Sequence, residues 1–254
     1  MYWTSIGGNM LLPARASGIY VLGYMKSGTT WLCHLLSGVL EIPVLQPWTL
    51  TAPFVGPAVY HMHRFLPVKK VRHRTAYIMR DGRDAMVSAY FHVVRENGGA
   101  KRILEHRFGR PFTAQNAKSN LADFILAMRE WNFSGPAYRQ HIEAWKTHRS
   151  QFVTVRYEDL LTEPEHHLTR IVTELIGESP DSDKVRDVVK QNAFDRVTRR
   201  QPGSENPNEF LRKGIAGDWR NYFSPQAAIV FDDYAGDLLL ELGYESDPHW
   251  VSTL

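Results

Sequence analysis

The segment Gly23-Tyr-Met-Lys-Ser-Gly-Thr-Thr-Trp31 has the residue types of a phosphate-binding loop, with its lysine in an unusual place. In the nucleoside-triphosphate loop G-x-x-x-x-G-K-[ST], backbone N–H groups cradle phosphates and the lysine after the second glycine neutralises the β- and γ-phosphates. Gly23 and Gly28 have the required separation, but Thr29 follows Gly28 and Lys26 lies inside the loop. We therefore expect an anionic ligand whose charge pattern differs from that of ATP or GTP.

Two further segments carry groups that suit a phosphate. Arg80 follows an apolar run, and Ser88 lies about one helical turn beyond Asp84, so a guanidinium and a hydroxyl can converge on one anion. A surface ion pair between Arg80 and Asp81 or Asp84 explains the same residues equally well. The third segment, 210–219, sets two cations beside glycines, and either a second phosphate contact or a solvated loop fits it.

His61 and His63 lie on the same side of an extended chain, because side chains alternate along a strand. A metal pair, a general base and two structural histidines are the possible interpretations. We rank the metal last, because no cysteine or carboxylate lies nearby in the sequence to complete a ligand set. Histidine suits proton abstraction near neutral pH.

Strand-like and helix-like patterns alternate around these segments. Apolar β-prone runs at 18–22, 75–79 and 152–155 each precede a helical pattern, beginning at Thr29, near Asp84 as N-cap, and after Arg156. Helices are also expected at 136–149 and from Ser224 to Leu242. Repeated strand–helix units predict an α/β fold with a P-loop-type parallel sheet flanked by helices, in a single domain spanning 1–254.

Three segments lack such periodicity. We expect the first ~17 residues and 198–210 to be flexible. The polar segment 100–120 is predicted to be irregular, and a mobile lid or substrate loop is one interpretation of it.

Bulk properties limit the partners. A net charge of +3 over 254 residues suits a small anionic ligand better than nucleic acid. Absence of any apolar run of about 20 residues predicts no membrane span. The single cysteine, Cys33, fits a reducing compartment, so a cytoplasmic location is expected.

The order of these motifs resembles the soluble cytosolic sulfotransferases that use 3′-phosphoadenosine 5′-phosphosulfate (PAPS). GYMKSGTTW is similar to the family's YPKSGTTW loop, with Met25 in place of the proline, and FLRKGIAGDW is similar to its RKGxxGDW signature. RDGRDAMVS resembles the 3′-phosphate segment, and RYEDL resembles the family's YEDL stretch. The resemblance runs from about residue 18 to 223.

The resemblance implies a role for each matching residue. Lys26, Ser27, Gly28, Thr29 and Thr30 would bind the 5′-phosphosulfate. The remaining nucleotide contacts would come from Trp31, Tyr157 and Phe194 at the adenine, and from Arg80, Ser88, Arg212, Lys213 and Gly214 at the 3′-phosphate. Trp31 is equally compatible with core packing.

The family's general base is the histidine of a K-x-H element, which is matched by His61-Met62-His63. The resemblance therefore makes His63 the base and puts His61 where a lysine is usual; which of the two histidines acts stays open. We expect transfer of a sulfuryl group from PAPS to a hydroxyl or amine, giving adenosine 3′,5′-bisphosphate without a metal.

Two other functions fit parts of the sequence. One is a P-loop kinase, which the missing post-glycine lysine disfavours, and the other is a non-catalytic nucleotide-binding module. The acceptor is expected to be a small, partly apolar molecule near His63, Trp48, Phe54 and Tyr60. Its identity and the oligomeric state are not readable from the sequence.

Overall fold

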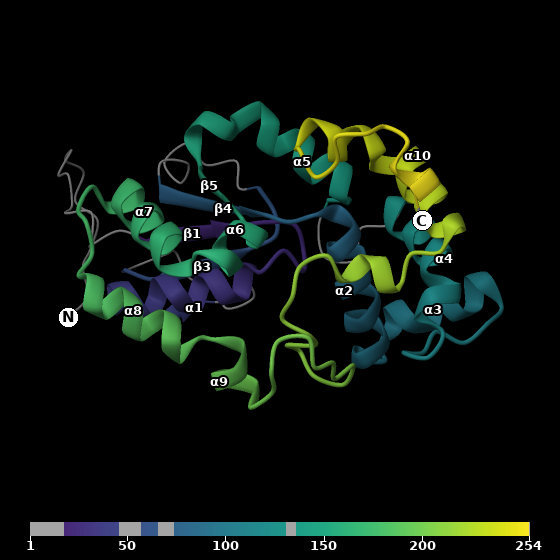
Figure 1. Cartoon of the computed structure of the whole chain (residues 1–254), viewed down its shortest axis with the longest axis horizontal. Coiled ribbons are helices and arrows are strands. Elements are labelled where there is room, and N and C mark those ends of the chain that lie inside the picture. Colours follow the sequence, from purple (N-terminus) through teal and green to yellow (C-terminus); the bar gives the residue numbers. More distant parts are fainter. Residues whose placement is uncertain (1–17, 46–56, 66–73, 131–135, 254) are drawn as a thin grey trace, which may run out of the picture. The chain divides into compact units, whose positions relative to one another are not determined.

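The computed structural model describes residues 18–45, 57–65, 74–130 and 136–253. Figure 1 shows the chain with its helices and strands labelled. In chain order these are β1 (Ile19–Leu22), α1 (Thr29–Leu40), β2 (Val44–Leu45), β3 (Val59–Met62), β4 (Thr75–Met79), α2 (Gly82–Glu96), α3 (Gly99–Phe108), α4 (Ala117–Glu130), α5 (Tyr138–His148), β5 (Val153–Arg156), α6 (Tyr157–Thr162), α7 (Pro164–Ile176), α8 (Ser182–Gln191), α9 (Phe194–Thr198) and α10 (Pro225–Glu241). Trp48 and Phe54 lie outside the described residues.

The strands form one sheet in the order β2-β3-β1-β4-β5. β1 pairs in parallel with β3 and β4, and β2 pairs in parallel with β3. Leu22, the last residue of β1, is in register with Met62, the last residue of β3. Because parallel strands end at the same edge of a sheet, this register sets Gly23 and His63 at one edge, where ligands of α/β sheets bind.

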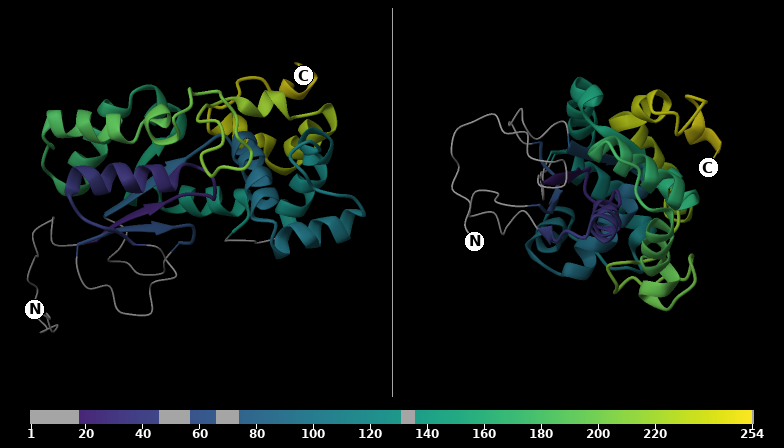
Figure 2. Two further views of the ribbon diagram at one scale, coloured as in Figure 1. Left: turned by 90° about the horizontal axis from the view of Figure 1, so that it is seen from below. Right: turned by 90° about the vertical axis from the view of Figure 1, so that its left-hand side faces the viewer.

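Helices α1 and α7 pack against strands of this sheet, and α8 packs against both helices, as can be followed in Figures 1 and 2. The helical spacing predicted from Thr29 is confirmed, since Leu32, Leu35 and Leu36 of α1 are fully buried. They share one hydrophobic core with Ile171 and Leu175 of α7. Burial of these side chains provides most of the driving force for forming this layer. The predicted α/β class, with a parallel sheet flanked by helices, is confirmed.

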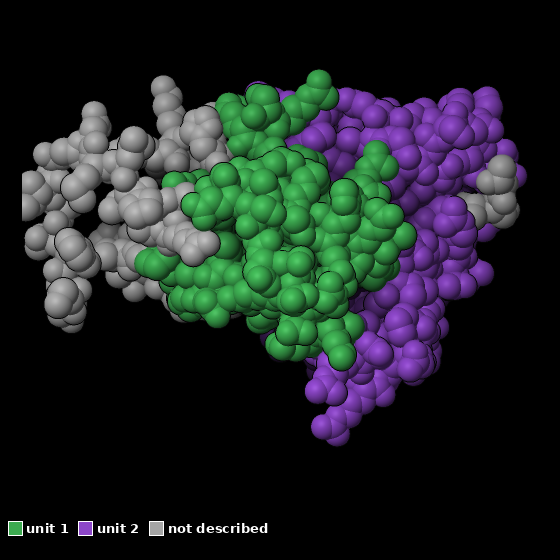
Figure 3. Space-filling view, turned by 60° about the vertical axis from the view of Figure 1, so that its left-hand side comes forward, with its two compact units in different colours: residues 1–23, 28–78, 148–193 green, residues 24–27, 79–147, 194–254 purple. Residues whose placement is uncertain are grey.

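The chain divides into two compact units, coloured separately in Figure 3. Unit 1 comprises residues 1–23, 28–78 and 148–193, and unit 2 comprises 24–27, 79–147 and 194–254. The sheet and α1, α7 and α8 belong to unit 1, whereas α2, α3, α4 and α10 belong to unit 2. One sulfotransferase-like domain over the whole chain stays a prediction.

The prediction of an irregular segment at 100–120 is wrong. Residues 99–108 form α3, and α4 begins at Ala117. Leu104 and Phe112 are completely buried, and the Tyr90 hydroxyl donates a hydrogen bond to the Thr113 carbonyl oxygen at 2.8 Å. A few well-packed apolar side chains thus order a segment whose composition is mostly polar.

Two helix boundaries also differ from the prediction. The N-cap of α2 is Asp81, not Asp84, because the Asp81 carboxylate accepts a hydrogen bond from the Arg83 backbone N–H at 2.9 Å. The helical pattern after Arg156 is split into α6 and α7, and Pro164 stands at the start of α7, where its missing N–H costs nothing. No helix within the described ranges is long and apolar enough to cross a bilayer.

Candidate active site

The start of α1 in unit 1 is suited to bind an anion. Gly28 precedes the helix with φ 94°, a left-handed conformation, and no side chain caps the helix N-terminus. A Cβ at Gly28 would lie 2.7 Å from Cδ2 of Tyr157, so only glycine fits there. The N–H groups of the first helical turn have no intrahelical partners, and the helix dipole adds positive potential. These are the features of a phosphate site.

His61 is held at this helix terminus. Its Nε2 and Oγ1 of Thr29 are hydrogen-bonded at 2.7 Å, and both side chains are buried. Burial, together with the nearby His63 and His34, lowers the pKa of His61 to about 4. The ring is therefore uncharged near neutral pH, and it cannot replace the cation of a lysine at this position.

His63 directly follows β3, and its ring stands edge-on to His61 with the ring centroids 4.7 Å apart. The predicted common side of the two histidines is thus confirmed. Nδ1 of His63 lies 2.9 Å from the carbonyl oxygen of Gly23. A carbonyl oxygen only accepts, so Nδ1 carries the proton of this bond. The neutral ring then has its lone pair on Nε2, which is the tautomer of a general base.

Trp31 and Tyr157, the aromatic residues predicted at the adenine, lie against each other in unit 1. Their ring centroids are 5.9 Å apart in an edge-on arrangement, and the indole N–H of Trp31 donates to the Asn192 carbonyl oxygen at 3.2 Å. Trp31 is partly exposed and also packs against the hydrophobic core, so its position fits both core packing and an adenine contact.

Lys26 and Ser27 belong to unit 2. Lys26 has φ 65°, uncommon for a residue with a side chain, and its Nζ lies 4.0 Å from the centroid of the Phe210 ring. Burial, followed by the charges of Arg95, Arg80 and Arg212, lowers the pKa of Lys26 to about 7, although Glu96 acts in the opposite direction. Ser27 is 1% exposed, and within the described part of the chain its hydroxyl has no hydrogen-bond partner. An unsatisfied buried hydroxyl is what a ligand-binding loop without its ligand would contain.

Arg80 follows β4 along the chain and is fixed by polar contacts within unit 2. Its guanidinium donates to the carbonyl oxygens of Lys26 at 3.1 Å and Ile215 at 3.2 Å. It also lies 3.6 Å from the Asp84 carboxylate, so the alternative of an ion pair is correct for Asp84. This pair does not exclude a phosphate contact. Ser88 lies one turn further along α2 and is partly exposed.

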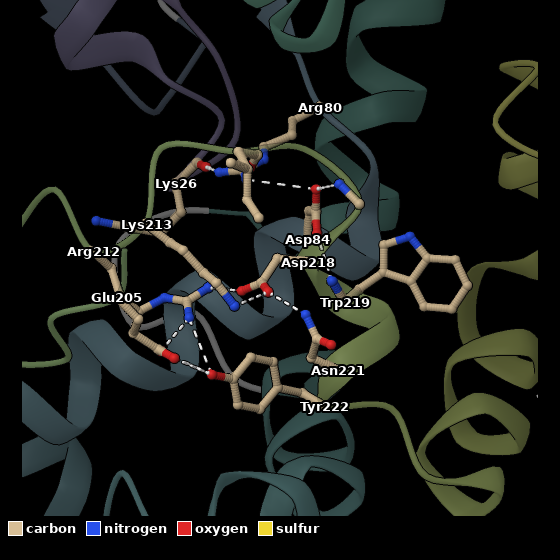
Figure 4. Close-up of polar contacts among 12 residues, drawn as sticks. Lys26, Arg80, Asp84, Glu205, Arg212, Lys213, Asp218, Trp219, Asn221 and Tyr222 are labelled. Carbon is tan, nitrogen blue, oxygen red and sulfur yellow. Dashed lines mark hydrogen bonds and ion pairs between the residues drawn. The ribbon is translucent and has the colours of Figure 1, made fainter. Parts of the chain in front are cut away.

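Arg212 and Lys213 converge on one carboxylate (Figure 4). Both donate to Asp218, Lys213 at 2.6 Å, and Asn221 donates to the same carboxylate at 2.7 Å. Burial acts to raise the pKa of Asp218, but these hydrogen bonds outweigh it and hold the pKa below its usual value. Arg212 also pairs with Glu205, whose carboxylate accepts from the Tyr222 hydroxyl at 2.7 Å.

The ring of Phe194 lies directly against Gly214. Gly214 has φ 66°, and a Cβ there would lie 2.3 Å from Cδ2 of Phe194. Phe194 also has the Arg200 guanidinium over its ring, 5.1 Å from the centroid. The structure therefore brings Arg80, Arg212, Lys213, Gly214 and Phe194 into one network of unit 2; their binding of a nucleotide stays a prediction.

Two carboxylates of this network, Glu205 and Asp218, were not identified from the sequence. Asp84 was predicted as the N-cap of α2, which is wrong, and as an alternative ion-pair partner of Arg80, which is correct. The only available signal was the presence of acidic residues beside cations in RDGRD and RKGIAGD. Tyr60, predicted near the acceptor, is buried and stacks on Tyr20 with centroids 5.0 Å apart. Among the described residues no cluster of three metal-ligating side chains occurs.

Comparison with known proteins identifies the family. The model of the sulfotransferase domain matches residues 61–243, which is more than half of the chain. The chain belongs to the sulfotransferase family. Sulfotransferase 2A1 of Macaca fascicularis is 21% identical over 266 residues, covering 91% of this chain and 87% of that protein. Human sulfotransferase 1C2 is 25% identical over 260 residues, covering 87% and 82%.

The fold is similar to that of a solved sulfotransferase. The crystal structure of mouse sulfotransferase SULT7A1 complexed with PAP has a TM-score of 0.65 and 19% identity, over 87% of this chain and 83% of that chain. These findings confirm the resemblance to the PAPS-dependent sulfotransferases of the cytosolic type and the predicted enzyme class. The family match begins at residue 61, so the loop at 23–31 is assigned by its own sequence and geometry.

Proposed function

We propose that this enzyme transfers the sulfuryl group of PAPS to a hydroxyl or amine of a small, partly apolar acceptor, with His63 as general base. The observation that carries the proposal is the bond between Nδ1 of His63 and the Gly23 carbonyl oxygen, because it assigns the base tautomer to the residue that follows β3. The nucleotide is supported by the mouse relative, which was solved with PAP.

The loop supplies the groups for the 5′-phosphosulfate. Thr29, Thr30 and the N–H groups at the start of α1 would donate to its oxygens, with Gly28 giving the close backbone approach. Ser27 would contribute the hydroxyl that has no protein partner among the described residues. Arg80, Ser88, Arg212, Lys213 and Gly214 would bind the 3′-phosphate, and Trp31, Tyr157 and Phe194 the adenine.

The chemistry proceeds as one exchange of bonds at sulfur. Nε2 of His63 takes the proton of the acceptor hydroxyl, the acceptor oxygen forms a bond to sulfur, and the bond from sulfur to the 5′-phosphate oxygen breaks. Negative charge then develops on the 5′-phosphate, where Lys26 stabilises it. A sulfuryl group carries less charge than a phosphoryl group, so a single lysine without Mg²⁺ suffices.

Lys26 must be protonated for this role. Its pKa of about 7 refers to the site without nucleotide. A bound anion favours the ammonium form, so the pKa rises when PAPS binds. Binding of PAPS therefore favours the protonated form of Lys26, which is the form that stabilises the leaving phosphate.

His61 has a structural role in this scheme. It is uncharged near neutral pH and bonded to Thr29, so it orients a hydroxyl of the loop instead of abstracting a proton. We further propose a cytoplasmic enzyme that needs no metal.

A transfer screen tests the proposal. Radiolabelled PAPS is incubated with phenols, alcohols, sugars or amines and either wild type or His63→Ala. We expect labelled product with at least one acceptor for wild type, together with an equal amount of adenosine 3′,5′-bisphosphate, and almost none for the variant. Binding of the bisphosphate without transfer to any acceptor would instead favour a non-catalytic nucleotide-binding module.

A further inference from the structure

Asp84 binds the backbone of a segment far away in the sequence. The residue is 2% exposed, and its two carboxylate oxygens accept separate hydrogen bonds, from the Trp219 N–H at 2.8 Å and from the Gly217 N–H at 2.7 Å. Figure 4 shows this carboxylate between Arg80 and Trp219. All of these residues belong to unit 2. A buried carboxylate that accepts two N–H groups is a strong anchor, because charge-assisted hydrogen bonds are about twice as strong as neutral ones.

The same carboxylate also fixes Arg80. The Arg80 guanidinium lies 3.6 Å from Asp84 and donates to the carbonyl oxygen of Ile215. Arg80 is thus held by α2 and by the segment that Asp84 anchors. A guanidinium restrained on two sides loses less side-chain entropy when it binds an anion.

The anchored segment carries the other cations of the site. Asp218 lies between the two residues whose N–H groups bind Asp84, and its carboxylate holds Arg212 and Lys213. Gly217 has φ 77°, so the backbone turns sharply at this anchor. A continuous series of contacts therefore runs from Asp84 through residues 217–219 to both cations.

We propose that Asp84 is a positioning residue that determines specificity for the 3′-phosphate, because it sets the spacing between Arg80 and Ser88 on one side and Arg212 and Lys213 on the other. The inference rests on the proposed binding of a 3′-phosphorylated nucleotide. Two groups of donors bind one dianion well only at a fixed separation, and a segment released from its anchor must be ordered again by each ligand.

For Asp84→Asn, a positioning role and a simple charge effect predict changes of opposite sign in the affinity for the phosphate. Removal of a negative charge near a phosphate site would strengthen phosphate binding if charge alone mattered. Loss of the anchor weakens binding, because the amide NH₂ of asparagine would face the N–H of Gly217 or Trp219. The sign of the change therefore distinguishes the two roles.

The experiment compares two ligands on the full chain by calorimetry. Adenosine 3′,5′-bisphosphate and adenosine 5′-monophosphate differ only in the 3′-phosphate, so the ratio of their Kd values isolates that group. For Asp84→Asn we expect the preference for the bisphosphate to fall about tenfold or more, with the monophosphate Kd changed less than about threefold. Glu105→Gln is the matched control, since the Glu105 carboxylate also accepts a backbone N–H, that of Phe112 at 3.0 Å, and pairs with Lys101. Its preference should stay at the wild-type value.

Each outcome has a distinct meaning. An unchanged or stronger preference for the bisphosphate in Asp84→Asn overturns the positioning role. An equal loss of affinity for both ligands also overturns it, because that result would show only a general disturbance of the structure. A wild type that does not distinguish the two ligands overturns the proposed nucleotide instead. If Asp84→Asn does not fold by circular dichroism, Asp84→Glu, which keeps the charge but moves it by one methylene, is measured against the same criteria.

Discussion

The ammonium of Lys26 lies over the ring of Phe210, with Nζ 4.0 Å from the ring centroid. This contact stabilises a cation in a buried position where Arg95, Arg80 and Arg212 disfavour it. With a pKa of about 7, Lys26 is close to half protonated at neutral pH, so a neighbouring anion would shift its charge.

Nucleotide binding should therefore take up a proton. At about pH 8 the unliganded lysine is mostly neutral, and the bound phosphate favours its protonated form. Calorimetry of adenosine 3′,5′-bisphosphate in two buffers with different ionisation enthalpies measures the uptake. We expect a clear uptake for wild type and a smaller one for Lys26→Met. Equal uptake in the two proteins would show that another group is responsible.

The stability of the protein should depend on pH through the same residue. The folded-state pKa of Lys26 lies below its ordinary value of 10.5, so the unfolded chain binds more protons between these values. The contribution of Lys26 to the free energy of unfolding thus rises with pH from about 7 to about 10.5 and is least favourable below that window.

Urea unfolding measures this contribution. Lys26→Met should increase the free energy of unfolding more at about pH 6 than at about pH 9, because only the charged lysine is penalised by burial. An equal increase in the free energy of unfolding at both pH values would mean that the pKa of Lys26 is not lowered in the folded protein.

The two histidines should respond differently to substitution. His63→Ala is expected to reduce kcat on the order of 100-fold or more, with the Kd for adenosine 3′,5′-bisphosphate little changed. His61→Ala should reduce kcat less and act partly on nucleotide affinity, because His61 contacts Thr29. Steady-state kinetics and calorimetry of both variants check this. A loss of kcat in His61→Ala as large as that in His63→Ala would contradict the assignment of the base.

Arg80→Ala should weaken the binding of adenosine 3′,5′-bisphosphate by about 1.5–3 kcal/mol, the range for hydrogen bonds to charged groups. The monophosphate serves as the control ligand, since it lacks the group that Arg80 would bind. Identical affinities of wild type and variant for the bisphosphate would reject the contact.

Glu205 is expected to weaken the binding of the nucleotide. Its carboxylate pairs with Arg212, and burial together with the hydrogen bond to Glu205 raises the pKa of Tyr222. Glu205→Gln keeps the shape but removes the charge that competes with a phosphate for Arg212. We expect the bisphosphate to bind about two- to fivefold more tightly, as removal of a partly exposed ion pair allows. Weaker binding would show that Glu205 supports the site instead.

The sequence predicted well those features that depend on local pattern. The strand at 75–79 has the predicted bounds and the helix 29–40 begins at the predicted residue, because β-prone apolar runs, helical spacing and the glycine loop are all short-range signals. The left-handed Gly177 that ends α7 was also identifiable as a helix terminus. His61 and His63 were correctly assigned to one side of the chain.

The sequence was less informative wherever distant residues decide the structure. α3 lies in a mostly polar segment without hydrophobic periodicity, and the burial of Leu104 stabilises it. Asp84 is a residue type typical of an N-cap, but its carboxylate accepts hydrogen bonds from the backbone N–H groups of Gly217 and Trp219, more than 130 residues away. The pairing of Arg212 and Lys213 with Asp218 is a matter of backbone turns at Gly214 and Gly217, not of spacing alone.

A crystal structure of the full chain with adenosine 3′,5′-bisphosphate tests the central claim most directly. The account predicts that Arg80, Ser88 and Arg212 all contact oxygens of the 3′-phosphate and that Lys26 lies at the 5′-phosphate. A bound nucleotide whose 3′-phosphate meets none of these three side chains would contradict it.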